Sequence, residues 1–220
     1  MRNKNEKIRI VAETAVMVAL ATILSLIKIY DAPYGGSVTL MSMLPIMILS
    51  CRRGTLCGLA GGFVYSVIEL LLGLNNVAWV PTAGGIALCI LFDYIIPFTL
   101  IGLCGMFFGG KDALSFNKAS RAWRILVGAL VVMLLRYVCH IISGVAVWYA
   151  LDLEWYADDP THIVHKYGAW LFSAIYNGSF MLPEIAITLI GAAALCCFQD
   201  RKKVKTEEFF SKSFLRRLRR

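Results

Sequence analysis

The segment ILVGALVVMLLRYVCHIISGVAVWYA, residues 125–150, decides the fold class of this chain. Its side chains are almost all apolar, and its only basic groups are those of Arg136 and His140. A helix of this length, rising about 1.5 Å per residue, is longer than the roughly 30 Å hydrocarbon core of a bilayer. We therefore predict that the segment crosses a membrane.

The whole chain shares this apolar character. Of its 220 residues, 59% are hydrophobic and 16% are charged, and its mean hydropathy is +0.69. Soluble domains do not have such a composition, so the sequence predicts an all-α integral membrane protein with six transmembrane helices. The expected spans are Ile10–Ile27, Val38–Ser50, Thr55–Leu74, Ile86–Phe108, Ile125–Ala150 and Gly168–Phe198.

The second span is the shortest and contains Pro45. We expect it to cross with irregular backbone that is packed inside the protein, where backbone polar groups find partners. The domain organisation is then simple. One membrane domain, residues 10–198, lies between a basic N-terminal tail, residues 1–9, and a basic C-terminal tail, residues 199–220.

Basic residues gather on one side of these spans. They occupy both tails, the pair Arg52 and Arg53, and the segment 111–124, whereas the loop 152–159 on the other side is acidic. Because cytoplasmic loops retain Lys and Arg, we predict a multi-pass protein of the plasma membrane with both termini in the cytoplasm. This topology and attraction to anionic membrane lipid account for the net charge of +8, so no nucleic-acid partner is expected.

Polar side chains inside the spans are few. Each needs a partner or a function, because a charge there costs on the order of 2.5 to 3.5 kcal/mol. With the orientation above, Asp93, His140 and Asn177 fall in the outer third of three different spans, and Glu69 and Glu184 also lie within the apolar segments. These positions predict that polar groups converge on a site facing the outside.

The fifth span carries a stripe of candidate site residues. Arg136, His140, Gly144 and Trp148 recur every four positions, a spacing that keeps them on one slowly drifting helix face. A basic group, an imidazole, a gap in the side chains and an indole suit a flat, ring-containing ligand. Tyr94, in the fourth span, adds an aromatic hydroxyl.

Structural roles for the same residues stay open at this point. Asp93 and Arg136 could form an ion pair, and His140 could be a packed core histidine. Trp148 could belong to an interfacial aromatic belt, and Asn177 could bridge two helices through its amide. The residues alone support a pocket without requiring one.

No catalytic motif is present in the sequence. Gly105, Gly110 and Lys111 match most of the phosphate-binding pattern G-x-x-x-x-G-K-[ST], but Asp112 replaces the hydroxyl residue that would hold magnesium. The seven cysteines show no metal-ligand spacing. We therefore predict that the chain is not an enzyme and has no metal and no cofactor.

Five ordered segments resemble the thiamine-specific substrate-binding subunits, or S-components, of energy-coupling factor (ECF) transporters. The segments are YGGSVTLMSMLPI from Tyr34, LSCRRG from Leu49, FDYIIPF from Phe92, LLRYVCHIISGVAVW from Leu134 and FSAIYNGSFMLP from Phe172. The resemblance implies a six-helix bundle that binds extracellular thiamine. It also implies an ECF module as partner, made of one membrane coupling subunit and two ATPases.

The resemblance also implies roles for individual residues. In that family the acidic residue of an acidic-Tyr pair, His and aromatic positions of the fifth helix and an Asn of the sixth contribute to the site. The matching residues here are Asp93, Tyr94, His140, Trp148 and Asn177. Arg136, Gly144 and Phe172 complete the expected set. Some relatives have Glu at the position of Asp93, Lys at that of Arg136, Tyr at that of Phe172 and Trp in the region of Gly36, so the pocket can differ in tightness.

Two further sets of residues are expected to move or to couple. The glycine-containing loop 31–39 has the backbone freedom of a cover, so Tyr34, Gly35, Gly36 and Trp79 are expected to form a lid, although an ordinary turn fits the same loop. The family couples to its partner through small residues of the first helix. Ala15 and Ala19 form such a small-x-x-x-small step.

Rival functions remain at the level of the sequence. An S-component for another ring-containing vitamin, such as riboflavin, would have the same architecture. An ion-coupled secondary transporter would use Asp93, Glu69 or Glu184 as proton or sodium sites. A membrane enzyme or adaptor would show no saturable binding of a vitamin.

Overall fold

The computed structural model describes residues 4–32, 35–108 and 118–218, and the side chains of 4–32, 35–107 and 123–195. Within these ranges, five helices are long and apolar enough to cross a membrane. They are Lys4–Leu26, Thr55–Leu72, Ala83–Phe107, Trp123–Trp155 and Ala169–Leu195. The expected helical membrane architecture agrees with this result, but the count of six is not confirmed.

The segment predicted as the second span differs most from the prediction. Helix α1 (Lys4–Leu26) is followed by an antiparallel hairpin of β1 (Lys28–Asp31) and β2 (Ser37–Thr39), and then by the short helix α2 (Leu44–Arg53). Pro45 stands in the first turn of α2, where the missing N–H of proline has no helical partner to lose. The segment 38–50 therefore consists of the end of β2, a turn at residues 40–43 and the buried part of α2, a helix of about 15 Å.

The fourth expected span is a single rod with three changes of helix type. After α3 (Thr55–Leu72) and α4 (Leu74–Val77), this rod consists of α5 (Ala83–Cys89), the π-helical turn η1 (Ile90–Ile95), α6 (Ile96–Leu100) and the 3-10 helix η2 (Ile101–Phe108). Pro97 explains the π turn, because its nitrogen cannot donate to the carbonyl of residue 93. Asp93 lies in this widened turn.

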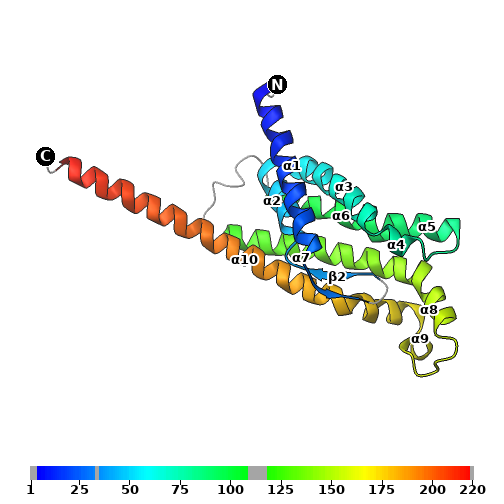
Figure 1. The fold of residues 1–220 in the computed structure, drawn as a ribbon. Helices are drawn as coiled ribbons and strands as arrows, with labels where there is room; N and C mark the ends of the chain where they lie inside the picture. The colour runs from blue at the N-terminus through cyan, green and yellow to red at the C-terminus, as the bar shows by residue number, and fades with distance from the viewer. Residues whose placement is uncertain (1–3, 33–34, 109–117, 219–220) are drawn as a thin grey trace.

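The last two expected spans run side by side (Figure 1). Helix α7 (Lys118–Ser143) continues through the π turn η3 (Gly144–Trp148) into α8 (Tyr149–Trp155), and the short α9 (Ile163–Lys166) leads to α10 (Ala169–Leu218). α10 is drawn yellow-orange to red in Figure 1 and is the longest of the described helices. It continues past residue 198, where we expected the cytoplasmic tail to begin.

Close helix contacts fix the end of the bundle opposite the hairpin. A Cβ atom on Gly102 of η2 would overlap the backbone of Gly58 in α3, so the two helices touch through glycines. The Glu13 carboxylate of α1 accepts hydrogen bonds from Arg52 and Arg53 at the end of α2. These contacts hold α1, α2, α3 and η2 together and leave the polar residues of the spans at the other end.

Candidate ligand-binding cavity

A cavity of about 380 Å³ lies where α1, the hairpin, α3, η1, α7, η3 and α10 meet. All eight residues predicted for substrate binding are on its wall, namely Asp93, Tyr94, Arg136, His140, Gly144, Trp148, Phe172 and Asn177. They come from three of the long rods of the bundle, as the sequence predicted for convergent polar groups. Their contact with a ligand stays a prediction.

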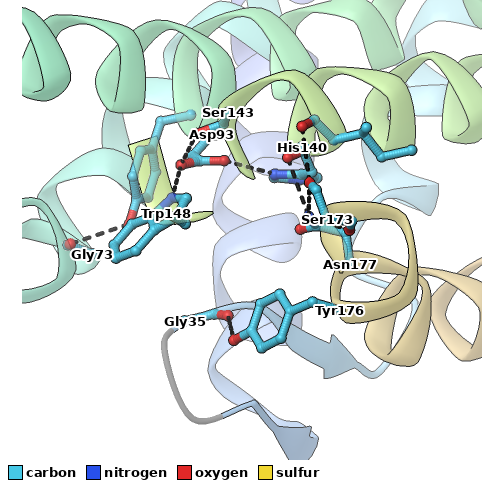
Figure 2. Close-up of polar contacts among 11 residues, drawn as sticks. Gly35, Gly73, Asp93, His140, Ser143, Trp148, Ser173, Tyr176 and Asn177 are labelled. Atoms are coloured by element: carbon cyan, nitrogen blue, oxygen red, sulfur yellow. Dashed lines mark hydrogen bonds and ion pairs between the residues drawn. The ribbon is translucent and has the colours of Figure 1, made fainter. Parts of the chain in front are cut away.

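Asp93 is the centre of a hydrogen-bond network (Figure 2). Its Oδ2 accepts from the Ser143 hydroxyl at 2.6 Å and from the Trp148 indole Nε1 at 2.9 Å. Its Oδ1 lies 3.1 Å from Nδ1 of His140. Three side chains of α7 and η3 therefore hold one carboxylate of η1 in a fixed orientation.

The ion pair considered between Asp93 and Arg136 does not form among the described side chains. Arg136 is 6% exposed, and its guanidinium lies over the ring of Phe98, 4.6 Å from the centroid. Its Nε and Nη1 atoms have no hydrogen-bond partner in the part of the chain that the structure describes. A buried guanidinium with free N–H groups on a cavity wall can donate to an acceptor in the cavity.

Gly144 allows α10 to approach η3. A Cβ atom at this position would overlap the hydroxyl of Ser173 and come within 3.0 Å of the Asn177 amide nitrogen. That nitrogen donates to the carbonyls of His140 and Ser173, at 3.2 Å and 2.9 Å. Asn177 thus bridges two helices, as one of the structural alternatives proposed, while its side chain also lines the cavity.

Aromatic rings form much of the remaining wall. Phe172 stacks on Tyr176 with 6.4 Å between ring centroids, and Phe180 meets the His140 ring edge-on at 5.9 Å. Tyr94 donates its hydroxyl to the carbonyl of Gly73 at 3.2 Å, so this hydroxyl binds the residue between α3 and α4 rather than its neighbour Asp93. The cavity therefore combines one ordered carboxylate with several ring faces.

The chain is similar to known proteins over most of its length. The model of the thiamine transporter protein family (Thia_YuaJ) matches residues 11–204. The chain belongs to the thiamine transporter family. The resemblance recognised in the sequence is thereby confirmed, and the protein is a multi-pass membrane protein, as its five apolar helices indicate.

Two relatives and one solved structure illustrate this membership of the thiamine transporter family. The thiamine transporter ThiT of Bacillus subtilis (strain 168) is 31% identical over 194 residues, which cover 86% of this chain and 91% of the relative. ThiT of Lacticaseibacillus paracasei is 27% identical over 199 residues, covering 87% and 89%. A structure of ThiT from Listeria monocytogenes shares the fold, with a TM-score of 0.68 and 21% identity over 89% of this chain and 97% of that chain.

Only some of the residues expected to form a lid line the cavity. Gly35 and Gly36 line it with positive φ angles of 92° and 95°, which glycine adopts without strain. Tyr34 lies outside the described residues. Trp79 is not on the wall; it is 45% exposed and meets Trp155 edge-on at 6.2 Å.

The residues expected to couple to the partner lie on the outside of the helix bundle. Ala15 and Ala19 are both exposed on α1, beside the exposed apolar side chains of Val11 and Val16. Their role in coupling stays a prediction. The exposure leaves room for another helix.

Several residues that line the cavity or bind its side chains were missed by the sequence reasoning. Ser143 and Ser173 are hydrogen-bonded to Asp93 and Asn177, and helical spacing could have found them, because they stand three residues after His140 and four before Asn177. Ser25, which donates to Glu69 at 2.6 Å, had no such signal. Its partner lies on a different helix.

Proposed function

We propose that this chain is the substrate-binding membrane subunit of an ECF-type ABC importer. It binds extracellular thiamine and delivers it inward when coupled to a separate ATPase module. The observation that carries the proposal is the cavity in which three donors orient Asp93, within a chain of the thiamine transporter family. The phosphate-binding pattern at Gly105, Gly110 and Lys111 is incomplete, so the proposal assigns ATP hydrolysis to the partner.

The chemistry of the cavity suits thiamine. Its charged lining residues are three acids and two bases, namely Asp31, Glu69, Asp93, Lys28 and Arg136. When all are ionised the wall has one excess negative charge, which the permanently cationic thiazolium ring neutralises. The Trp148 ring adds attraction of about 0.5 to 2 kcal/mol for a cation over its face. The volume lies within the range of roughly 300 to 1,000 Å³ for small-molecule sites.

Arg136 is the group on this wall that suits an acceptor of the ligand. The free Nε and Nη1 atoms would donate to a ring nitrogen, a hydroxyl or a phosphate oxygen, and would repel the thiazolium. The aminopyrimidine and the hydroxyethyl group of thiamine both offer such acceptors. Asp93 and Arg136 would then hold opposite ends of the ligand's charge distribution.

A sixth crossing and cytoplasmic termini complete the proposal. The segment proposed to make this crossing consists of β2, which is about 10 Å long at 3.3 Å per residue, a turn at residues 40–43 and α2, which is about 15 Å long. The contact of Glu13 with Arg52 and Arg53 supports placing the end of α2 beside the cytoplasmic part of α1. A membrane-impermeant label reacting with an introduced cysteine at Arg53 from the outside would contradict this topology.

A ligand titration tests the binding function. The purified protein is titrated with thiamine, thiamine phosphates, riboflavin and pyridoxine while tryptophan fluorescence is recorded, because Trp148 lies on the cavity wall. We expect saturable quenching by thiamine at or below micromolar concentration. Quenching by riboflavin alone would favour an S-component for that vitamin, and no saturable quenching by any of them would remove the proposal.

An uptake experiment tests the transport mechanism. The protein is reconstituted in vesicles with and without an ECF module, in which the membrane coupling subunit would contact α1 at Ala15 and Ala19. We expect uptake of thiamine only with the module and ATP. Uptake by the isolated chain that collapses with an ion gradient would favour the ion-coupled transporter that uses Asp93, Glu69 or Glu184.

A further inference from the structure

One face of α10 contacts the hairpin at successive turns. Tyr176, Phe180 and Glu184 are four residues apart and therefore share this face. The Tyr176 hydroxyl donates to the carbonyl of Gly35 at 3.1 Å (Figure 2). Phe180 lies so close to Gly36 that a Cβ atom there would stand 2.6 Å from its ring.

Glu184 makes the third and most polar of these contacts. It is 1% exposed, and both of its carboxylate oxygens bind Thr39 at the end of β2. The Thr39 amide donates to Oε2 at 2.6 Å, and the Thr39 hydroxyl donates to Oε1 at 2.8 Å. The Thr39 hydroxyl in turn lies 2.7 Å from that of Ser42, whose proton completes the chain of donors.

The buried carboxylate of Glu184 holds the end of the hairpin against α10. A carboxyl group within an apolar helix is costly unless its oxygens are satisfied, and here both are satisfied by one residue of the hairpin. A glutamine would present an N–H group to one of two donors, because an amide has only one acceptor oxygen. The contact therefore depends on the carboxylate and not only on the shape of the side chain.

We propose that Glu184 is the positioning residue of the β1–β2 hairpin and that this anchor sets how long a ligand stays in the cavity. Gly35, Gly36 and Thr39 all line the cavity, so loosening Thr39 from α10 loosens one wall. The effect on ligand residence rests on the proposed thiamine binding, whereas the effect on the hairpin does not. The two parts are tested separately.

Hydrogen exchange without ligand tests the anchoring. In the full-length purified protein, Glu184→Gln should raise amide exchange of the peptide covering 28–42 at least about tenfold, because local opening becomes less costly. Glu13→Gln is the matched control, since its carboxylate binds Arg52 and Arg53 and does not touch the hairpin. Unchanged exchange of this peptide in folded Glu184→Gln protein would overturn the proposal, whatever the ligand is.

A second variant keeps the test decisive if Glu184→Gln does not fold. Thr39→Val removes the hydroxyl donor and keeps the backbone amide bond to Glu184, so a smaller rise of about threefold is expected in the same peptide. Exchange equal to that of the unmodified protein would overturn the proposal. Tyr137→Phe is the control here, because the hydroxyl that it removes donates to Ala174 of α10 and not to the hairpin.

Stopped-flow binding of thiamine tests the effect on residence. We expect Glu184→Gln to raise the dissociation rate about tenfold and to change the association rate less than threefold, because mutations at one site act mainly on dissociation. An unchanged dissociation rate would refute this second part. If the unmodified protein binds no thiamine, the proposed function fails, and the exchange experiment still decides whether Glu184 positions the hairpin.

Discussion

Two charged groups of the cavity wall, the carboxylate of Asp93 and the guanidinium of Arg136, differ in their hydrogen bonds. The oxygens of Asp93 are bound by His140, Ser143 and Trp148. Arg136, one turn before His140 on α7, is buried, and two of its nitrogen atoms lack a hydrogen-bond partner among the described residues.

This difference indicates what Asp93 and Arg136 each contribute to binding. A carboxylate that is already oriented loses little conformational entropy when a cation binds, so little of the binding free energy is lost in ordering the side chain. A buried donor without a partner gains more than an exposed one when a ligand satisfies it. We therefore expect variants of Asp93 and of its hydrogen-bond partners to affect both stability and binding. Variants of Arg136 should affect mainly binding.

The largest effect is expected for Asp93→Asn. The amide loses the negative charge and meets its donors with an N–H group, so thiamine affinity should fall about a hundredfold, or about 2.7 kcal/mol. The melting temperature should fall as well. Isothermal titration calorimetry and thermal unfolding measure the two effects. Asp159→Asn is the control, because that carboxylate lies in a loop where it binds Thr161; an equal loss there would show that the site is not specific.

A somewhat smaller effect is expected for Gly144→Ala. The added methyl group overlaps Ser173 and must push α10 away from η3, which costs about 1 to 3 kcal/mol. Both stability and affinity should fall, because the displacement moves Phe172 and Asn177 of α10 away from the rest of the cavity wall. Gly84→Ala provides the control, since nothing lies within 4 Å of a Cβ atom there. Wild-type stability and affinity of Gly144→Ala would mean that the helices are not held this closely.

Arg136→Met tests whether the guanidinium contributes to binding more than to stability. Methionine keeps the apolar stem over Phe98 and removes the free donors, so affinity should fall about tenfold, or about 1.4 kcal/mol. The melting temperature should change less than in Asp93→Asn, because no hydrogen bond of Nε or Nη1 is lost. Arg136→Lys should restore part of the affinity. A loss of stability as large as that of Asp93→Asn would show that the guanidinium is structural.

The smallest effect is expected for Trp148→Phe. This change removes the hydrogen bond from Nε1 to Asp93 and keeps an aromatic face toward the cavity. The net loss of one such bond, about 0.5 to 1.5 kcal/mol, corresponds to roughly a threefold to tenfold weaker affinity by calorimetry. Trp170→Phe, at an exposed position, should leave binding unchanged. If both variants bind like the wild type, the indole nitrogen does not orient Asp93.

The site was more predictable than the path of the chain around it. Arg136, His140, Gly144 and Trp148 were found together because helical spacing places them on one face, and they line one cavity. The segment 38–50 was predicted as a span with irregular backbone, and its crossing stays a prediction. The pairing of its first residues with β1 was not predicted, because no local pattern reveals a pairing partner across a turn.

The partners of the polar residues were the least predictable feature. The pair considered for Asp93 was Arg136, yet the carboxylate is turned toward His140 instead. Asp93 lies in the π turn η1, and the widened turn sets the direction of its side chain. Pro97 was visible in the sequence, but the direction in which the turn would aim Asp93 was not.

The sequence by itself determined that this protein lies in a membrane, where its helices are and which polar residues are candidates for the site. Apolar length and the rarity of polar groups within it are local properties, and any helix in lipid must obey them. The tertiary structure alone decided which polar groups meet. Asp93, His140 and Glu184 find their partners 47, 47 and 145 positions away, and contacts over such separations exist only after the helices have packed.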